Sequence, residues 1–85
     1  MANTITVIVS RFTNNRIYGP RLLDVKTQSL DDAFAIGKDK TADGMSVIVR
    51  PNYNETDSKG RFFREWRSFN GEPFKEVRWE FPGNE

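Results

Sequence analysis

The sequence predicts an α+β fold: a single domain over residues 1–85 with the element order β-β-α-β-β-β, in which one short helix covers one face of a five-stranded antiparallel sheet. Three observations predict it. Two segments near the N-terminus alternate apolar and polar residues, a capped apolar stripe at helical spacing follows them, and the last third of the chain is typical of an aromatic β-hairpin. Short, right-handed connections then give the strand order 2-1-3-4-5, counted from the N-terminus.

The first two predicted strands form a hairpin with a long connection. Residues 5–10 and 21–27 both alternate between apolar and polar side chains, as strands with one buried face do. Asn14-Asn15 marks the turn between them. The side chains expected to face the core are Ile5, Val7, Val9, Leu23 and Val25.

The predicted helix begins at Ser29, whose hydroxyl can accept hydrogen bonds from free backbone amides. Asp31 and Asp32 follow at the positive end of the helix dipole, and Gly44 lies just beyond the expected end. The apolar stripe of the helix consists of Leu30, Ala33, Phe34 and Gly37. A glycine on the packed face indicates a close approach of helix to sheet.

Residues 45–50 predict the third strand, which Pro51 ends. Residues 52–60 are polar and small around one tyrosine, and this composition predicts a flexible loop. Residues 83–85 are expected to be a frayed C-terminus.

The last two predicted strands, residues 62–69 and 74–81, are joined by a four-residue loop. A two-residue turn at Asn70-Gly71 is the usual structure for this dipeptide. That turn would set Glu65 against Glu76, and like charges directly opposite each other cost stability. The sequence therefore favours the longer loop.

This register divides the hairpin into an ionic face and an aromatic face. Arg67 is expected opposite Glu76, and Glu65 opposite Arg78. The rings expected in the core are Phe62, Trp66, Trp79 and Phe81. The rings expected on the ionic face are Phe63, Phe69 and Phe74. On that face they either contact a partner or pack on one another.

Composition excludes several classes of chemistry. The chain has no cysteine and no histidine, so it lacks a thiolate metal site, a cysteine nucleophile and the commonest general base. Thirteen basic and twelve acidic residues give a net charge of +1, so no large field of one sign steers it toward polyanions or membranes. We expect no enzyme activity, no cofactor, no metal and no membrane association, and a cytoplasmic location.

Arginines interleaved with aromatic residues on a sheet are typical of proteins that bind RNA or single-stranded DNA. In the last hairpin, Glu65, Glu76 and Glu80 are available to pair with the arginines. The first hairpin has only Asp24 nearby. The candidates for nucleic-acid binding are therefore Arg11, Arg16, Arg21 and Tyr18.

The function that the sequence favours is that of a small non-catalytic binding module that docks on a protein partner, because five strands are wider than one short helix can cover. The candidate contact residues are Phe63, Phe69, Phe74 and Tyr53. A second copy of the chain could pair through the edge strand 21–27. In size and architecture the chain is similar to accessory proteins of phages and mobile elements that bind a host enzyme, though no motif carries this likeness. The alternative function is RNA or single-stranded nucleic-acid binding.

Overall fold

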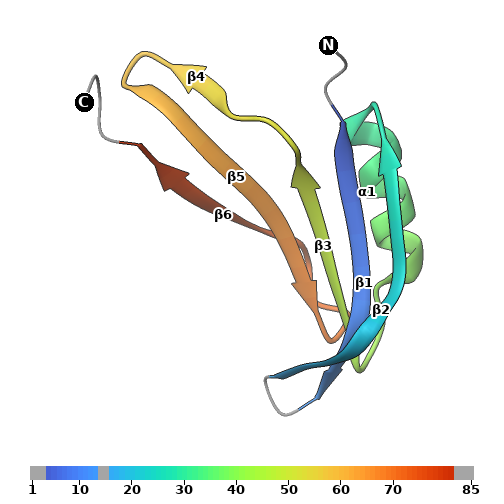
Figure 1. Cartoon of the computed structure of the whole chain (residues 1–85). Coiled ribbons are helices and arrows are strands. Elements are labelled where there is room, and N and C mark those ends of the chain that lie inside the picture. Colours follow the sequence, from blue (N-terminus) through green and yellow to red (C-terminus); the bar gives the residue numbers. More distant parts are fainter. Residues whose placement is uncertain (1–3, 14–15, 82–85) are drawn as a thin grey trace.

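The computed structural model describes residues 4–13 and 16–81, with the backbone alone described at residues 13 and 16–20. Within these ranges the chain forms one α-helix and one six-stranded sheet (Figure 1), which confirms the predicted α+β class. The elements are β1 (Ile5–Thr13), β2 (Arg16–Thr27), α1 (Leu30–Lys40), β3 (Met45–Pro51), β4 (Glu55–Asp57), β5 (Gly60–Phe69) and β6 (Lys75–Glu80). The predicted turn at Asn14-Asn15 and the predicted frayed end at 83–85 lie outside the described residues.

Every strand pair is antiparallel, and β2, β1, β3, β5 and β6 follow one another across the sheet. This is the predicted order of the five longer strands. The short strand β4 is an addition, and it pairs with the first half of β5 on the edge whose second half pairs with β3. Residues 52–60, predicted as a flexible loop, therefore contain a strand.

The core lies between α1 and the sheet face formed by β1 and β3. We call this the helix face and the opposite one the outer face. The fully buried core side chains are Ile5, Val7, Val9, Ala33, Val47 and Val49. As the sequence predicts, Leu23, Val25, Leu30 and Phe34 pack against this cluster. Each such aliphatic side chain contributes roughly 1.5–3 kcal/mol when it is fully buried, so the cluster anchors the fold.

Helix α1 has the predicted cap and lies close to the sheet. The Asp32 N–H donates to Ser29 Oγ at 3.3 Å. Gly37 is buried, and a Cβ atom at that position would lie 2.9 Å from Phe74 Cζ. The same Cβ would lie 3.4 Å from side-chain atoms of Val47 and Val49 in β3, which confirms the predicted close approach of helix to sheet. The aromatic ring from the β5–β6 connection lies closer still.

The register of the last hairpin differs from the predicted one by a single residue. Arg67 lies opposite Lys75, Glu65 opposite Val77 and Phe63 opposite Trp79. The connection spans five residues, 70–74, instead of four.

Tertiary contacts hold this connection in place. Asn70 has a φ of 57° and Gly71 one of 77°, so both adopt left-handed conformations. Asn70 N–H donates to Met45 O at 3.0 Å, and Gly44 N–H donates to Asn70 Oδ1 at 2.9 Å. The turn after the helix therefore fixes the loop and, with it, the register.

A shift of one residue turns every side chain of β6 to the other face. Trp79 and Phe81, predicted in the core, lie on the outer face with 43% and 39% of their surface exposed. Trp66 and Phe62 stay on the helix face, where Trp66 packs against Phe34 and Phe62 is buried. Phe74, predicted on the ionic face, also packs edge-on against Phe34.

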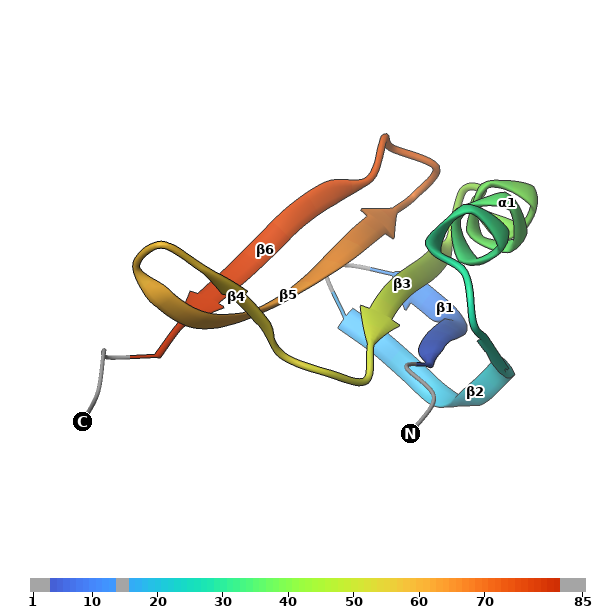
Figure 2. The ribbon, with the colours of Figure 1, turned by 90° about the horizontal axis from the view of Figure 1, so that it is seen from above.

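The molecule is elongated, because the ribbon of β4, β5 and β6 extends beyond α1 (Figure 2). Its principal extents are 41 × 27 × 22 Å, and its radius of gyration is 13.8 Å. A compact chain of this length has a radius of about 12 Å. The outer half of the ribbon is therefore one layer thick.

Candidate functional site

The outer face of β3, β5 and β6 gathers aromatic and basic side chains that are far apart in the sequence. Residues at alternate positions of a strand share one face. In β5 this brings Arg61, Phe63 and Arg67 together. One arginine from β3, one ring from β6 and the ring of Phe81, directly after β6, lie beside them. We call this set the aromatic–arginine face; its residues are Arg50, Arg61, Phe63, Arg67, Lys75, Trp79 and Phe81.

The rings of this face form a partly exposed platform. Phe63 and Trp79 stack across β5 and β6, with ring centroids 5.6 Å apart and an interplanar angle of 29°. The Arg67 guanidinium lies 5.6 Å from the Trp79 ring centroid, and that of Arg61 lies 5.7 Å from the Phe81 centroid. Each exposed ring thus has a cation beside it.

A buried glutamate organises two of the arginines. Glu65 is 1% exposed and accepts hydrogen bonds from Arg50 Nε at 2.9 Å and from Arg67 Nε. The two arginine side chains remain 38% and 34% exposed, respectively. Both use Nε for this contact, which leaves their Nη groups available to other acceptors. We call Arg50, Glu65 and Arg67 the triad. A shallow hollow of about 390 Å³ opens between the triad and the rings of Phe63 and Trp79.

The aromatic–arginine face is positively charged. Its four cations are balanced by the single carboxylate of Glu65, so the net charge is +3. Within the part of the chain that the structure describes, neither Arg61 nor Lys75 forms an ion pair. This field is local, since the whole chain carries a net charge of only +1.

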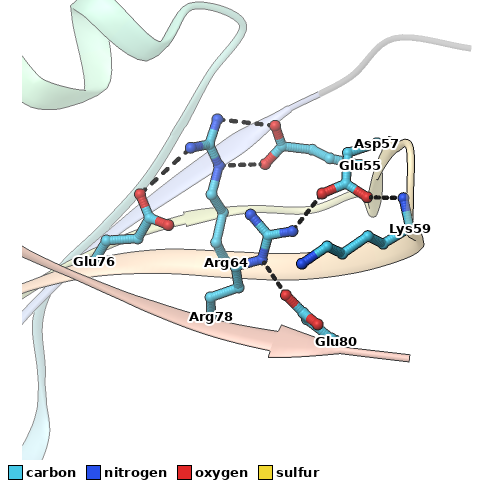
Figure 3. A network of polar contacts seen from close by, with 7 residues as sticks. All are labelled: Glu55, Asp57, Lys59, Arg64, Glu76, Arg78 and Glu80. Carbon is cyan, nitrogen blue, oxygen red and sulfur yellow. Dashed lines mark hydrogen bonds and ion pairs between the residues drawn. The ribbon is translucent and has the colours of Figure 1, made fainter. Parts of the chain in front are cut away.

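The helix face of the same ribbon has the opposite charge (Figure 3). Two arginines there meet four carboxylates, which gives a net charge of −2. Arg64 donates to Glu55 through Nε at 2.6 Å and through Nη2 at 2.9 Å, and it also contacts Glu76 at 3.4 Å. These contacts raise the pKa of Arg64.

The second arginine of this network, Arg78, joins β4 to β6. It lies 2.5 Å from Asp57 Oδ2 and 3.1 Å from Glu80 Oε2. The hydrogen bond from Arg78, with a second from the backbone N–H of Lys59, holds the pKa of Asp57 below its ordinary value of 3.8. Arg78 also lies over the Phe62 ring, 3.7 Å from its centroid. The predicted pairs Arg67–Glu76 and Glu65–Arg78 do not form, because the register differs.

The predicted protein-contact residues separate in the structure. Phe63 belongs to the aromatic–arginine face. Phe69 stacks on Phe12 with centroids 4.7 Å apart, Phe74 packs against Phe34, and Tyr53 packs against the core. Three of the four rings therefore pack elsewhere in the protein, and Phe63 alone belongs to the aromatic–arginine face.

The predicted nucleic-acid residues also do not form one site. Arg11 is exposed in β1, and Arg21 is bound to Asp24 of its own strand at 2.6 Å. The side chains of Arg16 and Tyr18 lie outside the described residues. Sequence reasoning missed the exposure of Trp79 and Phe81. The sequence signal for this exposure was the acidic pair Glu55 and Asp57. Their carboxylates bind Arg64 and Arg78 on the helix face, and this arrangement leaves the two rings on the outer face.

A second hollow lies between α1 and the β5–β6 connection. Its volume is about 550 Å³, and its apolar lining comes from Phe34, Trp66, Pro73 and Phe74. Lys38 lies at this hollow as well. This second hollow lies on the helix face of the sheet, opposite the aromatic–arginine face.

The structure of residues 4–13 and 16–81 gives no sign of a metal site or of a membrane-spanning helix. These residues contain no cluster of three or more side chains suited to hold a metal ion, and α1 is too short to cross a membrane. Comparisons of the chain with protein-family models, with curated proteins and with solved structures gave no significant match.

Proposed function

We propose that this protein is a non-catalytic module that binds single-stranded nucleic acid on its aromatic–arginine face. One observation carries the proposal: Trp79 and Phe81, 43% and 39% exposed, share a face with four cations and a single buried carboxylate. A cysteine-free chain suits a reducing cytoplasm, the compartment in which we propose that it acts.

The chemistry of this face fits a flexible polyanion with accessible bases. A base stacked on an exposed aromatic ring contributes about 1–3 kcal/mol, and any of the bases can do so. Guanidinium groups beside the rings can bind the phosphates that connect the bases. Stacking of this kind requires bases outside a duplex, so single strands are favoured over double helices.

Glu65 makes the arginines ready for such a ligand. It holds Arg50 and Arg67 through Nε, and both arginine side chains stay partly exposed on the same face. Side chains that are already ordered lose less entropy on binding than free ones. The buried carboxylate therefore favours binding even though it is negatively charged.

Fluorescence anisotropy with labelled oligo(U) and oligo(dT) of about twelve nucleotides tests the proposal, since this length covers a usual single-strand site. We expect Trp79→Ala to weaken binding on the order of ten- to a hundredfold, as the loss of one stacked base predicts. Leu22→Ala, which truncates another exposed apolar side chain, is the matched control and should leave binding unchanged.

Salt dependence supplies the second measurement. Each phosphate contact contributes about −0.7 to the slope of log K against log salt for a single strand. Arg61→Gln should therefore make the slope less steep by about 0.7, whereas Lys40→Gln, the same charge change on α1, should not. No binding, or binding that Trp79→Ala leaves intact, overturns the proposal.

Docking on a protein is the second candidate function, and the apolar hollow beside Phe34 and Phe74 favours it. Capture of partners from a lysate of the native host, with wild-type, Lys38→Glu and Trp79→Ala chains, separates the two functions. A protein lost with Lys38→Glu and kept with Trp79→Ala supports docking at the hollow. A partner that ribonuclease or deoxyribonuclease removes supports the first proposal instead.

A further inference from the structure

The edge of the sheet at β2 has a charge pattern that is complementary to itself. The strand pairs with β1 on one side, and among the described strands none covers its other side. Lys26 and Asp24 lie opposite Thr6 and Ile8, so their side chains belong to the outer face. The remaining N–H and C=O groups of residues 21–27 point along the plane of the sheet, away from β1, and can pair with another strand.

We propose that β2 pairs antiparallel with β2 of a second copy of this chain, with Val25 opposite its own counterpart. In this register Asp24 of each copy faces Lys26 of the other, so two ion pairs form about one two-fold axis. Leu23 then faces Thr27 on the helix face, next to the central pair of valines. Opposite charges directly across two strands stabilise the pairing.

The other symmetric registers near the middle of the strand are less favourable. A centre at Asp24 sets two aspartates against each other, and a centre at Lys26 sets two lysines against each other; like charges in these positions are destabilising. A centre at Leu23 leaves Asp24 opposite Leu22 and brings Lys26 onto Pro20, which has no N–H to donate.

The far edge of the sheet is a poorer choice for the same contact. Strand β6 is six residues long, and three of them, Glu76, Arg78 and Glu80, are bound into the network of the helix face. Charged side chains along a short edge strand oppose pairing with another chain. In β2, by contrast, Leu22 is 51% exposed and Val25 is only partly buried.

A pair with this symmetry keeps both copies of the aromatic–arginine face on one side of a continuous sheet. A two-fold axis perpendicular to the sheet maps the outer face of one copy onto the outer face of the other. The association does not use any residue of that face. The proposed dimer is therefore tested independently of the proposed binding of nucleic acid.

Sedimentation equilibrium over a range of protein concentrations tests the proposal by a charge exchange. Asp24→Lys sets two lysine pairs across the axis, and Lys26→Asp sets two aspartate pairs. Each single variant should raise the dissociation constant of the dimer by about tenfold or more, since two attractive pairs become repulsive. The double variant, Asp24→Lys with Lys26→Asp, restores opposite charges and should return the constant to within about threefold of the wild-type value.

The double variant excludes a general effect on folding. Asp24→Lys also removes the ion pair with Arg21, but such damage would add to that of the second change instead of cancelling it. Asp43→Lys, an equal charge change in the exposed turn after α1, should not alter the dissociation constant.

Amide hydrogen exchange locates the contact independently. Alternate amides of residues 21–27 should become more protected as protein concentration rises, while those of β6 should not. A chain that stays monomeric at every concentration overturns the proposal. So does a dimer whose dissociation constant is unchanged by the single charge reversals.

Discussion

Glu65 is the largest side chain that is fully buried in the described part of the chain, and it is charged. A carboxylate removed from water is costly unless it is paired and hydrogen-bonded. Arg50 and Arg67 satisfy this condition from the two sides, one from β3 and one from the same strand. At this residue the ion pairs join β3 to β5 and hold two arginines of the aromatic–arginine face in place.

Substitution of Glu65 should therefore reduce stability more than an exposed acid would. We expect Glu65→Ala to lower the free energy of unfolding by about 3 kcal/mol and Glu65→Gln by about 1–2 kcal/mol, because glutamine keeps the volume and one acceptor. Urea denaturation measures both. Glu72→Ala, in the exposed connection, should change stability by less than about 0.5 kcal/mol. Equal effects at the two positions would show that the triad is not stabilising.

Gly37 gives a second expectation at the scale of single residues. A Cβ there would lie 2.9 Å from Phe74 Cζ and 3.4 Å from side-chain atoms of Val47 and Val49. Alanine is a better helix former than glycine by about 1 kcal/mol, but overpacking costs about 1–3 kcal/mol. We therefore expect Gly37→Ala to destabilise the wild-type protein by about 1 kcal/mol.

The same change should be favourable once the ring is removed. In a Phe74→Ala background we expect Gly37→Ala to stabilise the protein by about 1 kcal/mol, because only the helix propensity then remains. Thermal or urea denaturation of the four chains completes the cycle. If alanine is equally harmful in both backgrounds, contact with Phe74 is not the reason for the glycine.

At the scale of elements, the last hairpin shows how a weak local preference yields to tertiary contacts. The predicted register formed two opposite-charge pairs between the two strands, Arg67 with Glu76 and Glu65 with Arg78, and each cross-strand pair contributes only about 0.2–1 kcal/mol. The observed register places Arg64 opposite Arg78, an unfavourable pair taken alone. Carboxylates from β4 compensate it, because Glu55 binds the first arginine and Asp57 the second.

The pairing of Asp57 with Arg78 should make the attachment of β4 sensitive to pH. The pKa of Asp57 is lowered in the folded protein, mainly by the hydrogen bond from Arg78. A lowered pKa contributes stability that is present above the unfolded pKa and is lost as the pH falls through the folded pKa. We expect Asp57→Asn to be less stable than wild type at neutral pH.

The difference between the two proteins should shrink as the pH falls through the lowered pKa of Asp57, because the wild-type carboxyl is then itself protonated. Urea denaturation at neutral and acid pH measures it. Because the aspartate is on the surface, the difference should also shrink in high salt. A difference that is the same at both pH values would mean that the charge of Asp57 plays no part.

The sequence was sufficient for the elements whose signals are local. Alternation placed β1 and the second half of β2 correctly, and Ser29 with its aspartates located the start of α1. Strand β4 could not be recognised, since three polar residues in a polar segment lack a strand pattern; its pairing depends on the ribbon beside it.

The candidate site was predictable only in part, because it too depends on contacts between segments that are distant in the sequence. Phe63 was correctly expected outside the core, but the exposure of Trp79 and Phe81 depends on whether the connection has four residues or five. Hydrogen bonds from Asn70 and Gly44 decide that number, and they join residues far apart in the sequence. Local pairing rules cannot include them.

At the scale of the whole molecule, stability should be unevenly distributed. Helix α1 covers β1 and β3, whereas the ribbon of β4, β5 and β6 extends beyond it (Figure 2). Regions with less buried apolar surface open at lower free energy. We expect amides of β4 and β6 to exchange with solvent at least about tenfold faster than those of β1 and β3.

Hydrogen exchange followed by NMR or mass spectrometry measures this difference. Addition of oligo(U) should slow exchange in β5 and β6 and leave β1 unchanged, because a ligand protects the region that it binds. Uniform exchange across the sheet would contradict the uneven distribution.

The extended ribbon separates opposite charges by the thickness of one sheet. A polyanion that approaches from the side of Glu55 and Glu76 meets repulsion, while one that approaches from the side of Arg61 and Lys75 is drawn in. Long-range forces of this kind act before any atoms touch. If the proposed binding occurs, this separation of charge would orient an incoming strand during diffusion, although the net charge of the whole chain is only +1.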